Sequence, residues 1–160
     1  MMAREEQTAR GHEEPFAVQF SIFLANRVGQ LRELLSIFTR NEVHVVGLSI
    51  VDATDWAVVR VVFTEPDKAR HILQTNSLPF TESEVLLVEV ADGDALGAVC
   101  AYLLGAELSV HFAFPLTIRS HDHPVMAFHV DDWVLATQVL IRHNYVLLGS
   151  EDLSDPTRLV

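Results

Sequence analysis

Cysteine, basic residues and long apolar runs are all scarce in this chain of 160 residues. The single cysteine, Cys100, excludes an internal disulfide framework and fits a reducing cytoplasm. No apolar run approaches the roughly 18 to 20 residues that a membrane helix needs. The net charge of −11 disfavours nucleic-acid phosphates and anionic membranes, which are met by clustered Lys and Arg. We therefore expect a cytoplasmic protein with neither nucleic acid nor membrane as a partner.

Motifs of the common catalytic sites are also missing. The sequence contains no GxSxG elbow, HExxH helix, P-loop or GxGxxG fingerprint. Cys100 falls in the apolar register of a predicted helix, so we expect a buried structural thiol and no nucleophile. Asp52, Asp55 and the pair Asp131 and Asp132 are explained as turn and N-cap residues. The sequence thus predicts a protein that is not an enzyme and has no cofactor.

Histidine is the residue that most invites a metal proposal, because the chain has eight. His121 and His123 flank one residue of a predicted hairpin, while His111 and His129 fall on neighbouring strands. Zinc sites need three or four convergent ligands, commonly at helical or CxxC-type spacing. The pattern therefore favours a solvated hairpin tip, and we predict no metal site.

The chain carries an internal repeat, which is its most informative feature. An apolar stripe at i, i+3, i+4 and i+7, typical of one buried helix face, occurs twice with an offset of 65: Leu31, Leu34, Leu35, Phe38 and Leu96, Val99, Cys100, Leu103. Glu42 and Glu107 keep this offset. It is 66 before the helix, where Phe20, Ile22 and Leu24 match Leu86, Val88 and Val90, and 67 towards the end of each copy. Shifts confined to loops indicate a duplicated fold.

Each copy follows the same order of elements. In the first, strands are predicted at 17–25, 43–51, 56–63 and 79–81, one helix ends near Arg40, and a second begins with Thr64 as N-cap and ends near Asn76. The order β-α-β-β-α-β is the ferredoxin-like arrangement. The predicted fold class is therefore α+β: two ferredoxin-like βαββαβ units, with antiparallel sheets and helices on one face. RNA-binding modules share this order, but 57–63 lacks their stacking aromatics within a basic pattern.

The repeat also sets the expected domain boundaries: a disordered leader at 1–15, units at 16–82 and 83–150, and a C-terminal tail at 151–160. The second strand is apolar on both alternations, Val43 and Val45 against Val46, Leu48 and Ile50. Apolar sheet surface thus exceeds what one chain can cover, so a homodimer is expected.

The segment from Leu24 to Leu31, with Asn26 and Gly29 before the helix, resembles the first loop of ACT domains. That family has Pro where this chain has Val28. The resemblance covers Ala17 to about Ser150 in two copies. It is strongest to stand-alone proteins of two ACT units and to the regulatory subunit of acetolactate synthase.

The resemblance implies that a small molecule, usually an amino acid, binds near the first loop and the second-strand edge of a neighbour. A helix N-terminus attracts a carboxylate, and exposed strand backbone can pair with an α-amino group. The implied ligand residues are Asn26, Arg27, Val28, Gly29, Gln30, Leu31, Val45, Val46 and Gly47, with a weaker second site at Asp92, Gly93, Asp94 and Leu96.

Ordinary structural roles remain open for the main residues of the first site. Gly29 is equally explained by a tight turn, Asn26 by a turn or cap, and Gly47 by a bulge. The expected function is a non-catalytic regulatory protein of amino acid metabolism that binds a small molecule, with an amino acid as the expected ligand. The alternative is a regulatory or interaction subunit of a biosynthetic enzyme, such as acetolactate synthase, without a ligand of its own.

Overall fold

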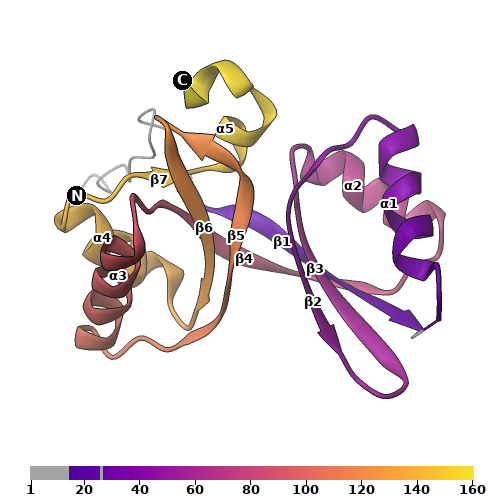
Figure 1. The fold of residues 1–160 in the computed structure, drawn as a ribbon, viewed down its shortest axis with the longest axis horizontal. Coiled ribbons are helices and arrows are strands. Elements are labelled where there is room, and N and C mark those ends of the chain that lie inside the picture. Colours follow the sequence, from indigo (N-terminus) through magenta and orange to yellow (C-terminus); the bar gives the residue numbers. More distant parts are fainter. Residues whose placement is uncertain (1–14, 26) are drawn as a thin grey trace, which may run out of the picture. The chain divides into compact units, whose positions relative to one another are not determined.

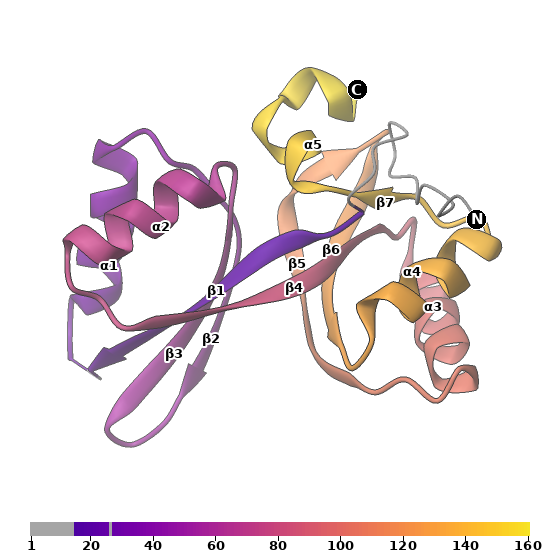
Figure 2. The same ribbon diagram turned by 180° about the vertical axis from the view of Figure 1, so that it is seen from behind.

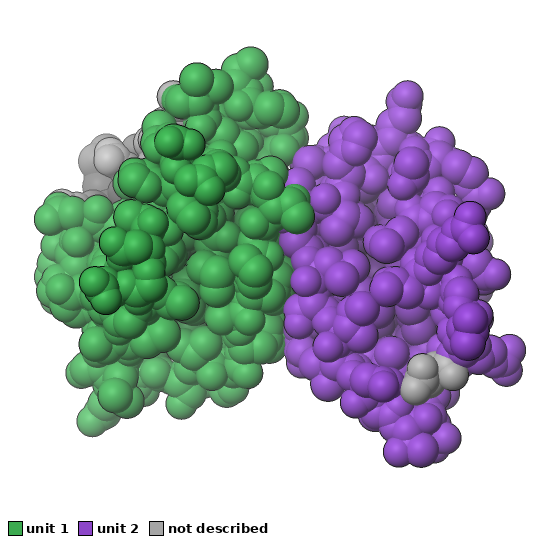
Figure 3. Space-filling view, viewed as in Figure 1, with its two compact units in different colours: residues 1–17, 84–160 green, residues 18–83 purple. Residues whose placement is uncertain are grey.

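A computed structural model describes residues 15–25 and 27–160 of the chain. The chain divides into two compact α+β units (Figure 3), which we call the N-terminal unit, residues 18–83, and the C-terminal unit, residues 84–160 together with residues 15–17. The leader predicted at 1–15 lies almost wholly outside the described residues. Each unit is described by itself below.

The N-terminal unit is an antiparallel sheet with two helices on one face (Figure 1). Its elements are β1 (Ala17–Ala25), α1 (Gln30–Arg40), β2 (Val45–Asp52), β3 (Trp56–Phe63), α2 (Pro66–Thr75) and the first residues of β4 (Phe80–Glu89). The central strand β3 pairs with β1 on one side and with β2 on the other. On the far side of β1, the backbone N–H of Phe23 donates to the carbonyl of Pro79 at 3.0 Å.

The core of the N-terminal unit lies between this sheet and its helices. Phe38 of α1 and Phe20 of β1 both pack on Phe63 of β3, with ring centroids 4.4 and 5.4 Å away. Ile72 and Leu73 of α2 complete the cluster. The predicted stripe of α1 is confirmed in part, because Leu34 and Phe38 are buried whereas Leu31 and Leu35 are half-buried.

The C-terminal unit repeats the same order with α3 (Gly93–Gly105), β5 (Val110–Ser120), β6 (His123–Val130), α4 (Trp133–Arg142) and β7 (Leu147–Leu148). Here β6 is central, between β4 and β5, and β7 adds to the far side of β4. Figure 2 shows the same unit from behind. Its core joins Leu86, Phe128 and Leu140 to Val99 and Leu103 of α3.

All four long helices end in the same way, which supports the duplication. A residue with positive φ follows each C-cap: Glu42 (58°), Ser77 (54°), Glu107 (60°) and Asn144 (67°). In α1 the N–H of Val43 donates to Phe38 O at 3.0 Å and that of Glu42 to Thr39 O at 3.1 Å. These two bonds define a Schellman motif, and α2, α3 and α4 make the corresponding pairs.

Two predicted element boundaries are wrong. A separate strand at 79–81 does not exist, because β4 runs without a break from Phe80 to Glu89 and enters both units. The predicted N-cap Thr64 precedes the actual one, Glu65, and its N–H instead donates to His44 O at 3.0 Å. The expected tail at 151–160 forms most of α5 (Ser150–Ser154) and the 3-10 helix η1 (Pro156–Leu159). None of the helices within the described residues combines the length and the apolar character needed to cross a bilayer.

Two isoleucines of the N-terminal unit test the assignment of its core. We expect Ile22→Ala to lower the free energy of unfolding by about 2 to 5 kcal/mol, because Ile22 is fully buried between sheet and helices. The same change at Ile50, which is 46% exposed, should cost about 1 kcal/mol or less. Urea denaturation of both variants measures this, and equal losses would contradict the described core.

Candidate functional site

The turn between β1 and α1 is the first candidate ligand site, and Gly29 sets its shape. Gly29 stands at the N-cap of α1 with φ +86°, a left-handed conformation that favours glycine. The N–H of Arg27 donates to Ala25 O at 2.8 Å, and that of Gln30 donates to Arg27 O at 3.3 Å. The chain therefore reverses tightly just before the helix. Asn26 lies outside the described residues.

The N-terminus of α1 has no side-chain cap from the part of the chain that the structure describes. Among the described residues, no side chain accepts a hydrogen bond from its first turn. The first N–H groups of a helix have no partner within the helix and lie at the positive end of its dipole. The exposed side chains of Arg27 and Arg32 add positive charge at this end. The arrangement suits a carboxylate or another small anion.

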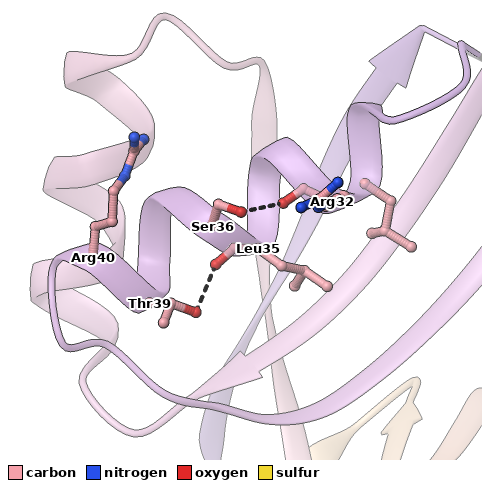
Figure 4. A pocket seen from close by; sticks show the side chains of 6 residues that line it. Arg32, Leu35, Ser36, Thr39 and Arg40 are labelled. Atoms are coloured by element: carbon pink, nitrogen blue, oxygen red, sulfur yellow. Dashed lines mark hydrogen bonds between the residues drawn. The ribbon is translucent and has the colours of Figure 1, made fainter.

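An open hollow of about 680 Å³ continues from this end along α1 (Figure 4). Leu31 and Leu35 supply apolar surface, and Arg32 and Arg40 supply charge. The other lining residues are Ser36 and Thr39, whose hydroxyls donate to carbonyls of the preceding turn at 2.8 and 3.0 Å. Sequence reasoning found Leu31 but missed the other five residues. The helical periodicity of the sequence could have revealed them, because residues 32, 36, 39 and 40 fall on one outward face of a helix.

The corresponding site in the C-terminal unit is occupied by its own carboxylate. Asp92 is the N-cap of α3, and its side chain accepts a hydrogen bond from the N–H of Ala95 at 2.8 Å. Gly93 and Asp94 form the first turn, and Leu96 is half-buried. The predicted weaker site is thus a helix cap in the structure.

The net charges of the two units also differ, and the C-terminal unit is the more acidic. The N-terminal unit has six basic and seven acidic residues, and residues 84–160 have three basic and eleven acidic ones. An anionic ligand is therefore repelled less by the N-terminal unit.

The second half of the predicted site, Val45 to Gly47, lies at the opposite end of the sheet from Gly29. Gly47 is opposite Val62 on β3, whereas the β1 end of the loop is opposite Trp56. Six residues of strand separate these positions, roughly 20 Å. A register shift between Val45 and Gly47 agrees with the bulge considered for Gly47. One N-terminal unit alone does not bring the two halves together.

Cys100 is exposed, so the prediction of a buried thiol is wrong. The stripe on α3 is narrower than its apolar sequence suggested, because only Val99 and Leu103 are fully buried. A run of apolar residues does not by itself reveal which of them face the sheet.

The other polar clusters have local structural partners. Glu89 accepts a hydrogen bond from Ser120 and contacts Nδ1 of His121, each at 2.5 Å. Asp131 contacts His111, and its carboxylate accepts a hydrogen bond from the N–H of Ser109 at 3.0 Å. These groups, the Ser109 N–H first, hold the pKa of Asp131 below its usual value.

Asp132, the neighbour of Asp131, caps α4 at the N–H of Leu135, 3.0 Å away. This confirms the N-cap role predicted for it. Within residues 15–25 and 27–160, no three His, Cys, Asp or Glu side chains converge as a metal site would require.

Two α+β units of equal element order, each with a loop leading into its first helix, define a duplicated small domain. The model of the family described as "ACT domain pair" matches residues 16–156. The chain belongs to this family of ACT domain pairs.

Solved structures with a similar fold include a protein from Bacteroides thetaiotaomicron, with a TM-score of 0.79, 22% identity, and coverage of 88% of this chain and 96% of that one. The ligand-free regulatory subunit of aspartate kinase from Thermus thermophilus has a TM-score of 0.56 at 8% identity, covering 79% and 91%. Its counterpart from Thermus flavus has a TM-score of 0.52 at 8% identity, with the same coverage. No curated protein sequence matches the chain.

Alanine substitutions at two glycines, one in the first site and one in α3, separate the cost of backbone strain from that of steric crowding. A Cβ at Gly29 would meet nothing within 4 Å, yet Gly29→Ala should lower the free energy of unfolding by about 1 to 2 kcal/mol because of its positive φ. A Cβ at Gly105 in α3 is equally free of contacts, and its φ is not positive. Gly105→Ala should therefore raise that free energy by about 0.4 to 1 kcal/mol. Chemical denaturation gives both values, and a neutral Gly29→Ala would rule out the left-handed turn.

Proposed function

We propose that this protein is a non-catalytic regulatory protein that binds a small carboxylate, an amino acid, at the N-terminus of α1. The observation that carries the proposal is the contrast between helix ends. Asp92 caps α3, the equivalent helix of the C-terminal unit, whereas α1 has no side-chain cap among the described residues. One duplicated unit thus keeps the anion-binding end that the other fills with its own carboxylate.

In this proposal the ligand carboxylate accepts hydrogen bonds from the first-turn N–H groups of α1. Arg27 and Arg32 contribute charge, and Leu31 contributes apolar contact beside the hollow. Gly29 has no side chain, so nothing on that residue obstructs the helix end. Each unit is proposed to be a ferredoxin-like βαββαβ fold, which holds this turn rigidly between β1 and the helix.

The strand residues of the predicted site could contact the ligand only if they came from a second copy of the chain. Because Val45, Val46 and Gly47 lie far from the loop within the N-terminal unit, they would face the loop of a second chain. We therefore propose that the protein is a homodimer. Its proposed place of action is the cytoplasm, in amino acid metabolism. Binding to α1 does not depend on this additional contact.

The fold shared with aspartate kinase regulatory subunits favours a second candidate function. The chain would then be an interaction subunit that modulates a separate biosynthetic enzyme. In that case its partner is a protein, and neither helix end needs to bind a free ligand.

Ligand binding is tested by a thermal-shift screen against the twenty amino acids. A ligand at about 100 times its Kd should stabilise the protein by about 2.7 kcal/mol, which corresponds to roughly 5 to 10 °C for a chain of this size. No shift from any amino acid would sink the sensor proposal and leave the interaction subunit.

The site is tested by a matched pair at Val28, which is 108% exposed and so loses no packing on substitution. Val28→Asp places a carboxylate beside the helix end, and calorimetry should show at least a tenfold weaker Kd through charge repulsion. In Val28→Asn the new side chain has nearly the same shape as aspartate but no charge. This variant should bind the amino acid with the same Kd as the wild type. Equal Kd values for the two variants would place the ligand elsewhere.

A further inference from the structure

The hollow on α1 combines apolar surface with positive charge. Leu31 and Leu35, which line it, are half-buried, and the exposed Arg32 and Arg40 lie toward its two ends (Figure 4). Along the helix axis the Cα atoms of the two arginines are roughly 12 Å apart, since each residue rises about 1.5 Å. The only acidic residue of α1, Glu33, does not line the hollow. The hollow is therefore a basic strip with an apolar centre.

The two arginines of this strip lack the carboxylate partners that other arginines of the chain have. Arg70, Arg119 and Arg158 each form ion pairs with Asp or Glu side chains. Within residues 15–25 and 27–160, the side chains of Arg32 and Arg40 have neither an ion pair nor a hydrogen bond. The chain has 22 acidic and 11 basic residues, yet these two guanidinium groups stay available to an anionic partner.

The hydroxyl groups of the strip add no donors for a partner. Ser36 donates its hydrogen to Arg32 O at 2.8 Å, and Thr39 donates to Leu35 O at 3.0 Å. The centre of the strip therefore offers mainly carbon surface. A matching partner needs apolar side chains in the middle and a carboxylate at each end.

The corresponding helix of the C-terminal unit shows that the fold does not need this charge. With the offset of 65, Arg32 and Arg40 correspond to Gly97 and Gly105 of α3. Both helices bury the same side against their sheets, although the equivalent positions of α3 are uncharged. The paired arginines are thus a feature of the outward surface of α1 alone.

We propose that the hollow on α1 is a docking surface for an acidic amphipathic helix of a partner protein. Leu31 and Leu35 are four residues apart and form a ridge that packs into a groove of a second helix. On that helix, carboxylates at positions i and i+7 lie on one side, about 11 Å apart, which is close to the spacing of the two arginines. Leucines at i+3 and i+4 then lie between them and contact the apolar centre. Complementary charge at both ends sets the register of the two helices.

This docking goes beyond the proposed amino acid site and does not depend on it. Arg40 is ten residues from Gln30, where α1 begins, and this is roughly 15 Å along the helix axis. Arg40 is therefore too far away to contact a carboxylate at the helix N-terminus. A change at Arg40 separates the two kinds of binding, so either one can fail without the other.

Fluorescence anisotropy with a labelled synthetic peptide tests the docking surface of the full chain. The acidic peptide has about fifteen residues, the length that an isolated helix needs, with glutamates at i and i+7, leucines at i+3 and i+4, and alanines elsewhere. Its control has glutamine in place of both glutamates. The acidic peptide should bind at least about fivefold more tightly than the control, and high salt should remove this difference.

A matched pair of variants locates the contact. Arg40→Glu and Arg142→Glu make the same charge change in the last turn of α1 and of α4. Arg40→Glu should weaken binding of the acidic peptide at least about fivefold while its circular dichroism and its Kd for an amino acid stay unchanged. Arg142→Glu should bind the acidic peptide with the same Kd as the wild type.

Three results would overturn the proposal: no binding of the acidic peptide below about 1 mM, equal binding of the glutamine peptide, or equal Kd values for the two variants. Vesicles of phosphatidylglycerol provide a further control. Vesicle binding that is lost in Arg40→Glu, without binding of the acidic peptide, would make an anionic lipid surface the partner and would also contradict a docked helix.

Discussion

Burial of one apolar sheet face under two helices is the constraint on which the rest of this structure depends. In the N-terminal unit Leu34 and Phe38 must face the sheet, and this fixes the rotation of α1 about its axis. In the C-terminal unit Val99 and Leu103 must face the sheet in the same way, and this fixes the rotation of α3 about its axis. Once the buried side is set, helical geometry decides which residues face outward. The exposed residues Gly97, Ala101 and Leu104 of α3 therefore occupy helix positions equivalent to residues that line the hollow on α1, with different chemistry.

The two units show how a duplicated fold diverges without changing its frame. The Schellman motifs are retained after all four long helices, even though no glycine stands at the positive-φ positions. What differs is the helix entrance. Gly29 has no side chain that could cap α1, whereas the side chain of Asp92 caps α3. A stabilising cap and a bound anion would compete for the same N–H groups, so the cap at Asp92 stabilises α3 at a position where α1 has no side-chain partner among the described residues.

The continuous strand β4 shows where local reasoning fails. The repeat predicted a short strand at 79–81 as the end of one unit and a second unit that begins at 83. However, the backbone of β4 stays extended although its partners change: its first residues belong to one unit, and its remainder, which pairs with β6 and β7, belongs to the other. The spacing of 65 to 67 residues was correctly found, but it did not reveal this shared strand.

The sequence by itself determined the repeat, the element order, the α+β class and the turn at Gly29, because each depends on periodicity or on the conformational limits of nearby residues. Only the tertiary structure decided which half of each apolar stripe is buried, that Cys100 is exposed, and that Asp92 caps α3. It also placed Val45 to Gly47 and Gly29 at opposite ends of one sheet. These features depend on strand register and helix rotation, which arise from packing between segments distant in the chain.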